Sequence, residues 1–284
     1  MAVDGISRIH APAKVNLNLR ITGRRDDGYH LLDSVVVFSS FGDWIELKPA
    51  RADCVDVTGG FASSVGTGED HICFHALAAY RDYGGVADCL SITIDKQIPV
   101  GAGLGGGSSD AAVILRYLNR VSTSPLAEAR LAEAALSLGA DVPVCLSGIA
   151  QRIQGIGDML TPIDPAPHGH LVLARADAML PTADVFRSLR ESGSLGAAAL
   201  HSSEISGPLA DIVAAGNGLQ AAAMSLSSDI AGVLDQLRDS KSVIKAQMSG
   251  SGSACFGLFD DADDAATAAR NLAQNGIWAV ATRF

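Results

Sequence analysis

The sequence predicts an α+β fold of two domains, and three observations indicate it. The chain has 284 residues, which at about 150 residues per domain fits two modest domains. Stretches that alternate with the two-residue period of strands are mixed with helical stretches, and short glycine-rich loops join neighbouring strands, which favours α+β over a doubly wound parallel sheet. Pro162, Pro165 and Pro167 crowd one short segment, so we place the boundary there, with domains at 1–160 and 161–284.

The first half of the chain begins with strands and continues into helices. Apolar and polar residues alternate from Val15 to Ile21, which predicts a half-buried strand before a turn at 23–28. Further strands are expected at 31–38, 44–47 and 90–94. After the glycine-rich stretch 101–107, Ser108-Ser109-Asp110 offers an N-cap and an acidic first turn for a helix to about Asn119. Ser124-Pro125 predicts the start of the next helix, and Gly139 its end.

The second half repeats the mixture of strands and helices. Strands are expected at 171–173, on both sides of a loop within 246–259, and at 278–282. Helices are expected around 219–226 and at 262–274. These elements complete the second of the two predicted domains.

Composition excludes several classes of protein. Hydrophobic residues make up 48% and charged residues 18% of the chain, so it is not intrinsically disordered. The net charge of −10 opposes binding to nucleic acid. No apolar run approaches the ~18 residues that cross a bilayer, and the amino terminus lacks the apolar region of a signal peptide. We therefore expect a cytoplasmic protein with neither nucleic acid nor membrane as a partner.

The glycine-rich stretch between a strand and a helix is the strongest functional signal. Its five glycines (101, 103, 105, 106 and 107) let backbone N–H groups converge on an anion at the positive end of a helix, as phosphate sites do. A dinucleotide site would need a second strand with an acid about 20 residues on, where Ser124-Pro125 instead predicts a helix. A P-loop would need a lysine after the glycines, whereas Lys96 precedes them. The alternative is that the glycines merely allow close packing.

Polar residues elsewhere are compatible with both a functional and a structural role. Lys14 and Asn16 are two apart, so they lie on one polar face of the strand, where a lysine can also protect a sheet edge. Tyr29-His30 follows a turn and could contact a ligand or lie on the surface. Asp141 stands at a predicted helix start, where capping alone would explain a carboxylate.

Two further patterns have structural alternatives as well. The stretch 247–255 is a second glycine and serine loop that could offer donors to an anion or form a tight hairpin. His71 and His75 are four apart on a predicted helix, but no third metal ligand is evident, so we interpret them as ordinary helix residues. The five cysteines are odd in number and contain no C-x-x-C pair, which argues against a disulfide framework and a zinc site.

Several motifs occur together in an order that is specific. They read P-A-K-V-N-L-N-L (12–19), D-G-Y-H-L-L-D-S-V (27–35), P-V-G-A-G-L-G-G-G-S-S-D-A-A (99–112), L-G-A-D-V-P-V-C-L (138–146) and Q-M-S-G-S-G-S-A-C-F (247–256). The chain thereby resembles the small-molecule kinase superfamily of galactokinase, homoserine kinase and mevalonate kinase. Within it, the resemblance is to the family of 4-diphosphocytidyl-2-C-methyl-D-erythritol kinases, and it spans nearly the whole chain.

The resemblance implies a fold, a reaction and a nucleotide site. It implies an amino-terminal ATP-binding domain of α/β type and a ferredoxin-like carboxy-terminal domain, with substrate in the cleft between them. The substrate's 2-hydroxyl would attack the γ-phosphate of ATP, with Asp141 as proton acceptor and Lys14 as its cationic partner. The cofactors would be ATP and the Mg²⁺ that ATP carries. The ATP-binding positions would be Pro99, Gly101, Gly103, Leu104, Gly105, Gly106, Gly107, Ser108 and Ser109.

The same resemblance implies a pocket for the cytidine diphosphate part of a small-molecule substrate. Tyr29 and Phe186 match the aromatic residues that sandwich the cytosine ring, and His30 matches the residue that bonds its edge. Asn16 matches a polar residue near the substrate, and Thr182 belongs to a short motif that helps to form the pocket. No residue is assigned as a metal ligand, although Asp110 lies beside the loop.

One departure from the family and two alternative functions accompany this interpretation. Where the family often has Asn-Asp-Leu-Glu, this chain has Asn217-Gly-Leu-Gln220, so the role of that segment is open. One alternative is a sibling kinase acting on homoserine or a mevalonate derivative, which would not need a base pocket. The other is a nucleotide-binding regulator without catalysis, which the presence of both Lys14 and Asp141 opposes.

Overall fold

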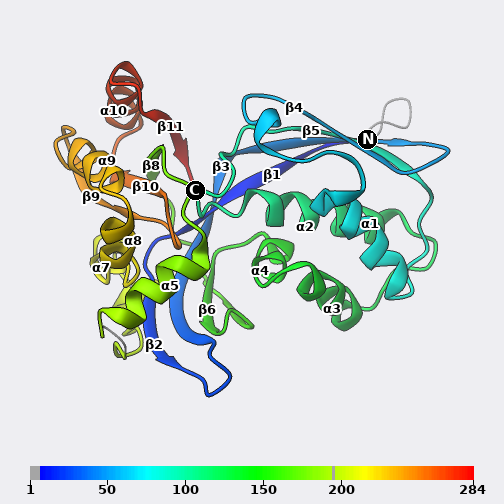
Figure 1. The fold of residues 1–284 in the computed structure, drawn as a ribbon, viewed down its shortest axis with the longest axis horizontal. Coiled ribbons are helices and arrows are strands. Elements are labelled where there is room, and N and C mark those ends of the chain that lie inside the picture. The colour runs from blue at the N-terminus through cyan, green and yellow to red at the C-terminus, as the bar shows by residue number, and fades with distance from the viewer. Residues whose placement is uncertain (1–6, 194–195) are drawn as a thin grey trace. The chain divides into compact units, whose positions relative to one another are not determined.

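The structure is a computed structural model that describes residues 7–193 and 196–284 (Figure 1). The chain forms two compact units. Unit 1 comprises residues 1–13, 42–100 and 105–148, and unit 2 comprises 14–41, 101–104 and 149–284. The absence of a signal peptide was predicted from the amino-terminal residues, and the first six of these lie outside the described ranges. The division of the chain into domains at residue 160 stays a prediction.

Unit 1 combines strands with the helices that follow the glycine-rich stretch. Its strands are β1 (Ser7–Asn16, up to residue 13), the second half of β3 (His30–Pro49), β4 (Cys54–Thr58) and β5 (Leu90–Asp95). Its helices are η1 (Ala62–Ser64), η2 (Gly68–Asp70), α1 (Ile72–Asp82), α2 (Gly106–Val121), α3 (Glu128–Leu138) and α4 (Asp141–Ser147). β5 pairs antiparallel with β3 and parallel with β4.

The predicted alternation in β5 is confirmed by burial. Leu90, Ile92 and Ile94 are buried, and the residues between them are only partly covered. α2 buries an almost continuous apolar run from Ala111 to Leu115, so this helix lies within the core of unit 1. Helix α2, which follows the glycine-rich stretch, is thus packed into the core of unit 1.

Unit 2 contains a four-stranded antiparallel sheet with the order β11-β8-β10-β9. Its strands are β8 (His170–Arg175), β9 (Val243–Met248), β10 (Ala254–Phe259) and β11 (Trp278–Arg283). In chain order, β8, β9, β10 and β11 therefore occupy the positions of a ferredoxin-like β-α-β-β-α-β unit, with helices before β9 and after β10. The predicted ferredoxin-like part of the fold is confirmed.

The remaining elements of unit 2 are a second group of strands and a series of helices. The strands are β2 (Arg20–Arg24), the first half of β3, β6 (Gln151–Gly155) and β7 (Met159–Pro162). The helices are α5 (Thr182–Glu191), α6 (Ser203–Ser206), α7 (Leu209–Ala214), α8 (Gln220–Leu226), α9 (Asp229–Arg238) and α10 (Ala262–Gln274). β3 pairs with both β2 and β6.

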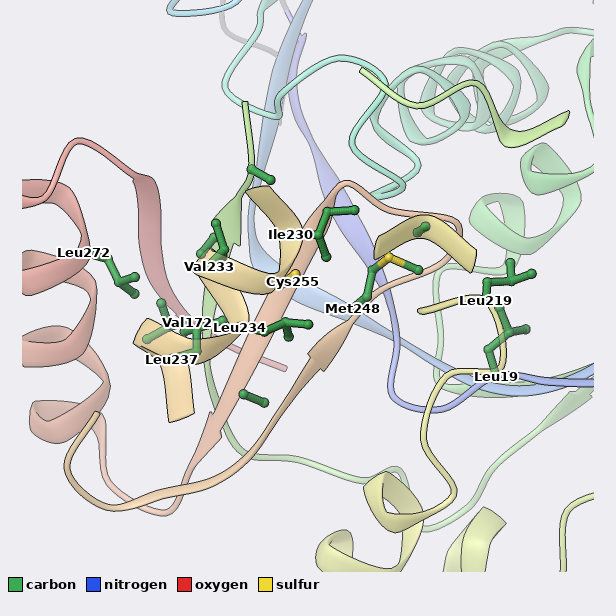
Figure 2. Packing of buried hydrophobic residues seen from close by; sticks show 14 of the residues in the cluster. Leu19, Val172, Leu219, Ile230, Val233, Leu234, Leu237, Met248, Cys255 and Leu272 are labelled. Atoms are coloured by element: carbon green, nitrogen blue, oxygen red, sulfur yellow. The ribbon is translucent and has the colours of Figure 1, made fainter. Parts of the chain in front are cut away.

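One face of the ferredoxin-like sheet carries the core of unit 2 (Figure 2). Helix α9 contributes Ile230, Val233, Leu234 and Leu237 to a cluster that also contains Leu272 of α10. The apolar residues of α9 recur at intervals of three and four, which puts them on one face of the helix. Cys255 of β10, Met248 of β9 and Val172 of β8 lie in the same cluster.

The expected strand from Val15 to Ile21 is interrupted. β1 ends at Asn16 and β2 begins at Arg20. The side chain of Asn18 explains the gap, because its Oδ1 accepts the backbone N–H of Val35 at 2.7 Å and its Nδ2 donates to the carbonyl of Ile212 at 2.9 Å. The Asn18 side chain thus accepts the N–H of Val35, which in a continuous strand pair would donate to a backbone carbonyl.

Two strands predicted as separate form a single strand, β3. It runs from His30 to Pro49 through Gly42. A Cβ at Gly42 would stand 2.2 Å from the carbonyl oxygen of Ala11, so the glycine marks a close approach of two backbones inside the strand rather than a turn.

The helix predicted from Ser124 begins four residues later, at Glu128. Ser122 Oγ accepts the N–H of Ser124 at 3.1 Å, and Asn119 Oδ1 accepts that of Leu126 at 2.7 Å. These side chains hold the preceding residues in a turn. The predicted end at Gly139 is confirmed.

Across residues 7–193 and 196–284, no helix has the length and apolar character that a membrane span requires.

Candidate active site

The glycine-rich stretch adopts a backbone that glycine favours and leads directly into α2. Gly101, Gly103 and Gly105 have φ angles of 68°, 77° and 65°, in the left-handed region that residues with a Cβ rarely adopt. Gly105 is the N-cap, and α2 starts at Gly106. The prediction that Ser108-Ser109-Asp110 caps this helix is therefore wrong, because the left-handed Gly105 begins the helix earlier.

The residues predicted to bind ATP are distributed over both units. Gly101, Gly103 and Leu104 belong to unit 2, and Pro99 and the residues from Gly105 to Ser109 belong to unit 1. Gly105, Gly106, Gly107 and Ser108 are partly exposed at the first turn of α2, whereas Pro99, Leu104 and Ser109 are buried. The first backbone N–H groups of a helix have no acceptor within the helix, so those at the start of α2 can donate to an anion. The next element is helix α3, as the exclusion of a dinucleotide-binding fold predicted.

Within unit 2, the two glycine-rich loops pack backbone against backbone. The N–H of Ala254 donates to the carbonyl of Ala102 at 2.9 Å. A Cβ at Gly103 would stand 2.9 Å from the carbonyl oxygens of both Ser249 and Gly252. The loop between β9 and β10 is therefore a hairpin, which confirms the structural alternative, and it also supports residues 101–104. Anion binding by this loop stays a prediction.

Lys14 and Asn16 are not on a solvated face. Each is 5% exposed, and the N–H of Lys14 donates to the carbonyl of Leu104 at 2.8 Å. The backbone N–H of Asn16 donates to Ser249 Oγ at 3.1 Å, and Asn16 Nδ2 donates to Ser34 Oγ at 2.8 Å. This burial contradicts the alternative of an edge-protecting lysine and brings the Lys14 segment against both glycine-rich loops.

Asp141 is the first residue of α4, as predicted. The N-cap position is held by Ala140, and a carboxylate in the first turn is stabilised by the helix dipole. Asp141 lies in unit 1, whereas Lys14 lies in unit 2.

The residues predicted to bind the cytidine end come from unit 2. The rings of His30 and Phe186 are stacked, with centroids 4.6 Å apart and planes at 24°. Tyr29 is 62% exposed, and Thr182 Oγ1 lies 2.9 Å from Ser251 Oγ. In the structure His30, rather than Tyr29, is the ring that stacks on Phe186.

Among the residues predicted to bind the substrate, two buried polar atoms have no hydrogen-bond partner in the described part of the chain. They are His30 Nε2 and Asn16 Oδ1. Burial lowers the pKa of His30, and the positive charges of Arg190 and Arg24 lower it further. A neutral imidazole offers one donor and one acceptor, which suits the edge of a nucleobase.

Sequence reasoning missed a buried ion triad in unit 1. Lys96 Nζ lies 2.6 Å from Asp43 Oδ2 and 2.7 Å from Asp110 Oδ2, and a Cβ at Gly106 would approach Lys96 Nζ to 3.0 Å. Burial raises the pKa of Asp110 to about 7; Lys96 opposes this shift and Asp43 adds to it. Asp110 thus has a lysine as its partner, and nothing in the local sequence links residues 43, 96 and 110.

A second missed pair lies in unit 2. Asp33 is 1% exposed, and Arg152 donates to its two carboxylate oxygens at 2.7 and 2.5 Å. The N–H of Leu200 donates to the same carboxylate at 3.0 Å. The pair joins β3 to β6, and Asp33 also binds the segment that precedes α6. Asp33 is three residues after His30 in the sequence.

Comparison with known proteins assigns the chain to a family. The model of the GHMP kinases N terminal domain matches residues 71–149, and that of the GHMP kinases C terminal matches residues 204–277. The 4-diphosphocytidyl-2-C-methyl-D-erythritol kinase of Paramagnetospirillum magneticum is 40% identical over 278 residues, or 96% of each chain. This chain belongs to the 4-diphosphocytidyl-2-C-methyl-D-erythritol kinase family. It is therefore an ATP-dependent kinase of the GHMP type.

Further relatives agree with membership in the 4-diphosphocytidyl-2-C-methyl-D-erythritol kinase family. The Brucella abortus kinase of that name is 40% identical over 285 residues, covering 98% of this chain and 94% of the relative. A crystal structure of 4-(cytidine 5'-diphospho)-2C-methyl-D-erythritol kinase superposes with a TM-score of 0.84 at 32% identity, over 98% of each chain. Mevalonate kinase from L. major, at 15% identity and a TM-score of 0.68, over 99% of this chain and 98% of that one, shares the fold. The predicted two-domain α+β fold is confirmed.

Proposed function

We propose that this chain transfers the γ-phosphoryl group of MgATP to the 2-hydroxyl of 4-diphosphocytidyl-2-C-methyl-D-erythritol, in the non-mevalonate route to isoprenoids and in the cytoplasm. The substrate oxygen forms a bond to the γ-phosphorus while the bond from that phosphorus to the β,γ-bridging oxygen breaks. ADP leaves, and the hydroxyl proton goes to Asp141. The observation that favours this substrate over homoserine or mevalonate is the His30–Phe186 stack, because a substrate without a base needs no such aromatic group.

In this proposal, Asp141 and Lys14 divide the chemistry. Asp141 accepts the proton, and it lies in the first turn of α4, where the helix dipole favours a carboxylate. Lys14 supplies positive charge next to the transferring group. Its burial supports this role, because an ammonium removed from water interacts more strongly with phosphoryl oxygens.

The glycine-rich stretch 101–107 and the helix start that follows it supply the phosphate site. Residues 101–104 and the first turn of α2, up to Ser108, bind the phosphates of ATP through backbone N–H groups. The N–H of Ser109 donates to the carbonyl of Gly105, so Ser109 closes this turn. Mg²⁺ enters as part of the nucleotide substrate. Because phosphoryl transfer passes through a loose transition state, accurate placement of the phosphates contributes more than the basicity of Asp141.

For the cytidine end, Tyr29, His30 and Phe186 bind the base, and Asn16 and Thr182 lie near the rest of the substrate. The unpartnered His30 Nε2 supports an edge contact with the cytosine. Entry of the ring between Tyr29 and Phe186 requires that His30 leaves its present stack and turns toward the edge of the base. The stack then gives affinity, and the edge contact gives base choice.

The test is ADP release from MgATP by the purified protein with three candidate acceptors. We expect turnover with the cytidyl-diphospho-methylerythritol compound and none with homoserine or mevalonate. Turnover with homoserine or mevalonate instead would replace the proposal by a sibling kinase. ATP binding without turnover of any acceptor would favour a non-catalytic regulator.

Asp141→Asn tests the proposed proton acceptor. We expect kcat to fall by about 10² or more, the usual contribution of general base catalysis, with little change in the KM for ATP. Asp229→Asn is a matched control, because Asp229 is likewise the first residue of a helix, α9, and is exposed; its kcat should stay unchanged. Near-normal turnover of folded Asp141→Asn would exclude the assigned role.

A further inference from the structure

The segment Asn217–Gln220 follows α7 and ends at the first residue of α8. The side chains of Asn217 and Gln220 reach the backbone of the β9–β10 hairpin. Asn217 Nδ2 donates to the carbonyl of Met248 at 2.7 Å and to that of Gly250 at 2.9 Å. Gln220 Oε1 accepts the N–H of Met248 at 2.9 Å. The two amide side chains therefore hold both sides of Ser249, at the point where β9 turns into the glycine and serine loop.

The segment is itself held in place. Asn217 Oδ1 accepts the N–H of Leu219 at 2.9 Å, which orients the amide so that its NH₂ group faces the hairpin. The backbone of Gly216 and Gly218 bonds to that of Leu19, at 2.9 and 2.7 Å. Leu19 follows the Lys14–Asn16 strand closely in sequence, so the segment is fixed to the same part of unit 2 that carries Lys14.

The hairpin in turn determines the space for residues 101–104. The carbonyl oxygens of Ser249 and Gly252 approach Gly103 so closely that a Cβ there would stand 2.9 Å from each. The N–H of Ala254 is bonded to Ala102. A shift of the hairpin by a few tenths of an ångström would therefore displace Gly103 or break these contacts.

From these contacts we propose that Asn217 and Gln220 are positioning residues for nucleotide binding: they hold the β9–β10 hairpin, which holds residues 101–104 in place, with Gly101 and Gly103 in the left-handed conformation. The inference rests on the proposed function, because it takes residues 101–104 as part of the ATP site. The neutral amide of Asn217 is essential to this role. A carboxylate there would face two carbonyl oxygens and could donate to neither.

The decisive comparison is between Gln220→Leu and Gln220→Glu. Leucine removes the acceptor and leaves the buried N–H of Met248 without a partner, whereas glutamate keeps an acceptor oxygen at the same reach. We expect Gln220→Leu to raise the KM for MgATP about tenfold, with less than a twofold change in the KM for the cytidine substrate. Gln220→Glu should stay within about twofold of the original chain for both. A general loss of stability would not separate the two KM values in this way.

Asn217→Asp gives a second test. It should raise the KM for MgATP at least as much as Gln220→Leu, because it removes two hydrogen bonds. Asn275→Asp is the matched control: Asn275 also donates through Nδ2, to Gln236 Oε1 at 2.8 Å, but it is exposed and lies outside both glycine-rich loops. Should Asn217→Asp fail to fold, the Gln220 pair decides, because Asn217 is intact in both of its variants.

Direct binding of MgATP and of MgADP, measured by calorimetry, separates the two proposals. If the original chain binds the nucleotide but phosphorylates no acceptor, the proposed function fails, while the dissociation constants of the variants still test the positioning role. If the chain turns over its substrate and Gln220→Leu binds MgATP as tightly as Gln220→Glu does, the positioning role is wrong. The same conclusion follows if the chain binds no nucleotide at all.

Discussion

Asp110 shows how burial changes the behaviour of a single residue. In the sequence it is notable only because it stands beside the glycines, but in the fold it is fully buried and bonded to Lys96. Burial lowers the pKa of Lys96, yet Asp110 and Asp43 together raise it above its ordinary value. The lysine therefore stays charged, and the pKa of Asp110 is raised to about 7, chiefly by burial.

The raised pKa of Asp110 predicts a pH-dependent stability. Between its ordinary value near 4 and about 7, the folded chain holds a proton that the unfolded chain has released. This contribution is fully present below about pH 4 and is lost as the pH rises through 7. Relative to Asp110→Asn, which cannot titrate, the free energy of unfolding of the original chain should fall by up to ~1.4 kcal/mol per pH unit between pH 5 and 7.

Urea unfolding of both chains at pH 5, 6, 7 and 8 measures this difference. Above pH 8 the two curves should run parallel, because Asp110 is then ionised in both the folded and the unfolded state. Asp229→Asn, which changes an exposed carboxylate, should run parallel to the original chain throughout. Parallel curves for Asp110→Asn between pH 5 and 7 would contradict the raised pKa.

At the scale of elements, helix starts decide where functional groups lie. α2 follows a left-handed glycine at its N-cap, α4 begins at Asp141, and α10 follows an N-cap whose side chain accepts hydrogen bonds. Only the last of these carries the expected local signal, an aspartate that accepts two N–H groups of the first turn. The start of α2 depends on backbone that glycine can adopt, and this places the first turn directly after the glycine-rich stretch.

The cap of α10 supports a quantitative prediction. Asp261 Oδ1 accepts the N–H of Asp263 at 2.8 Å and that of Asp264 at 3.1 Å. Asp261→Ala should lower the free energy of unfolding by about 1 kcal/mol, and Asp261→Asn, which keeps an acceptor, by only a few tenths. Urea unfolding at one pH distinguishes them. Equal losses in the two variants would show that charge rather than capping stabilises this end of α10.

At the scale of the whole molecule, the two units are interleaved along the chain. The chain passes from one unit to the other after Ala13, Phe41, Val100, Leu104 and Gly148. Leu19 and Ile21 belong to the same core cluster as α9 and β10, although some 200 residues separate them in sequence. Residues 161–284 alone therefore lack part of the hydrophobic core of unit 2, because Leu19 and Ile21 contribute to it.

This interleaving predicts that a polypeptide of residues 161–284 is destabilised. Without Asn18, the carbonyls of Glu204 and Ile212 lose the Nδ2 donor that bonds them at 2.9 Å each. We expect faster hydrogen exchange in α6 and α7 than in the full chain, while the β8–β10 pairing stays protected. Joining residues 14–41 to 149–284 by a flexible linker should restore protection. Equal exchange in 161–284 and the full chain would instead support an independent domain after residue 160.

Features whose cause lies in neighbouring residues could be predicted from the amino-acid sequence. The period of β5, the bounds of α10, the end of α3 at Gly139 and the glycine-rich loop are all local patterns, and the ordered motifs led to the kinase family and its two-domain α+β fold. For these features, the physical cause lies within one or two turns of the chain. The residues assigned to the site stay a prediction from the same motifs.

The tertiary structure alone decided the features that depend on distant residues. The break at Asn18 needs Ile212, the continuity of β3 at Gly42 needs Ala11, and the charge of Lys96 needs Asp43. The hydrogen bond from Asn217 to the carbonyl of Met248 likewise joins residues that are far apart in sequence. A hydrogen bond or ion pair across such separations forms when packing brings its two members together and removes water from them, and no local pattern records which residue the partner will be.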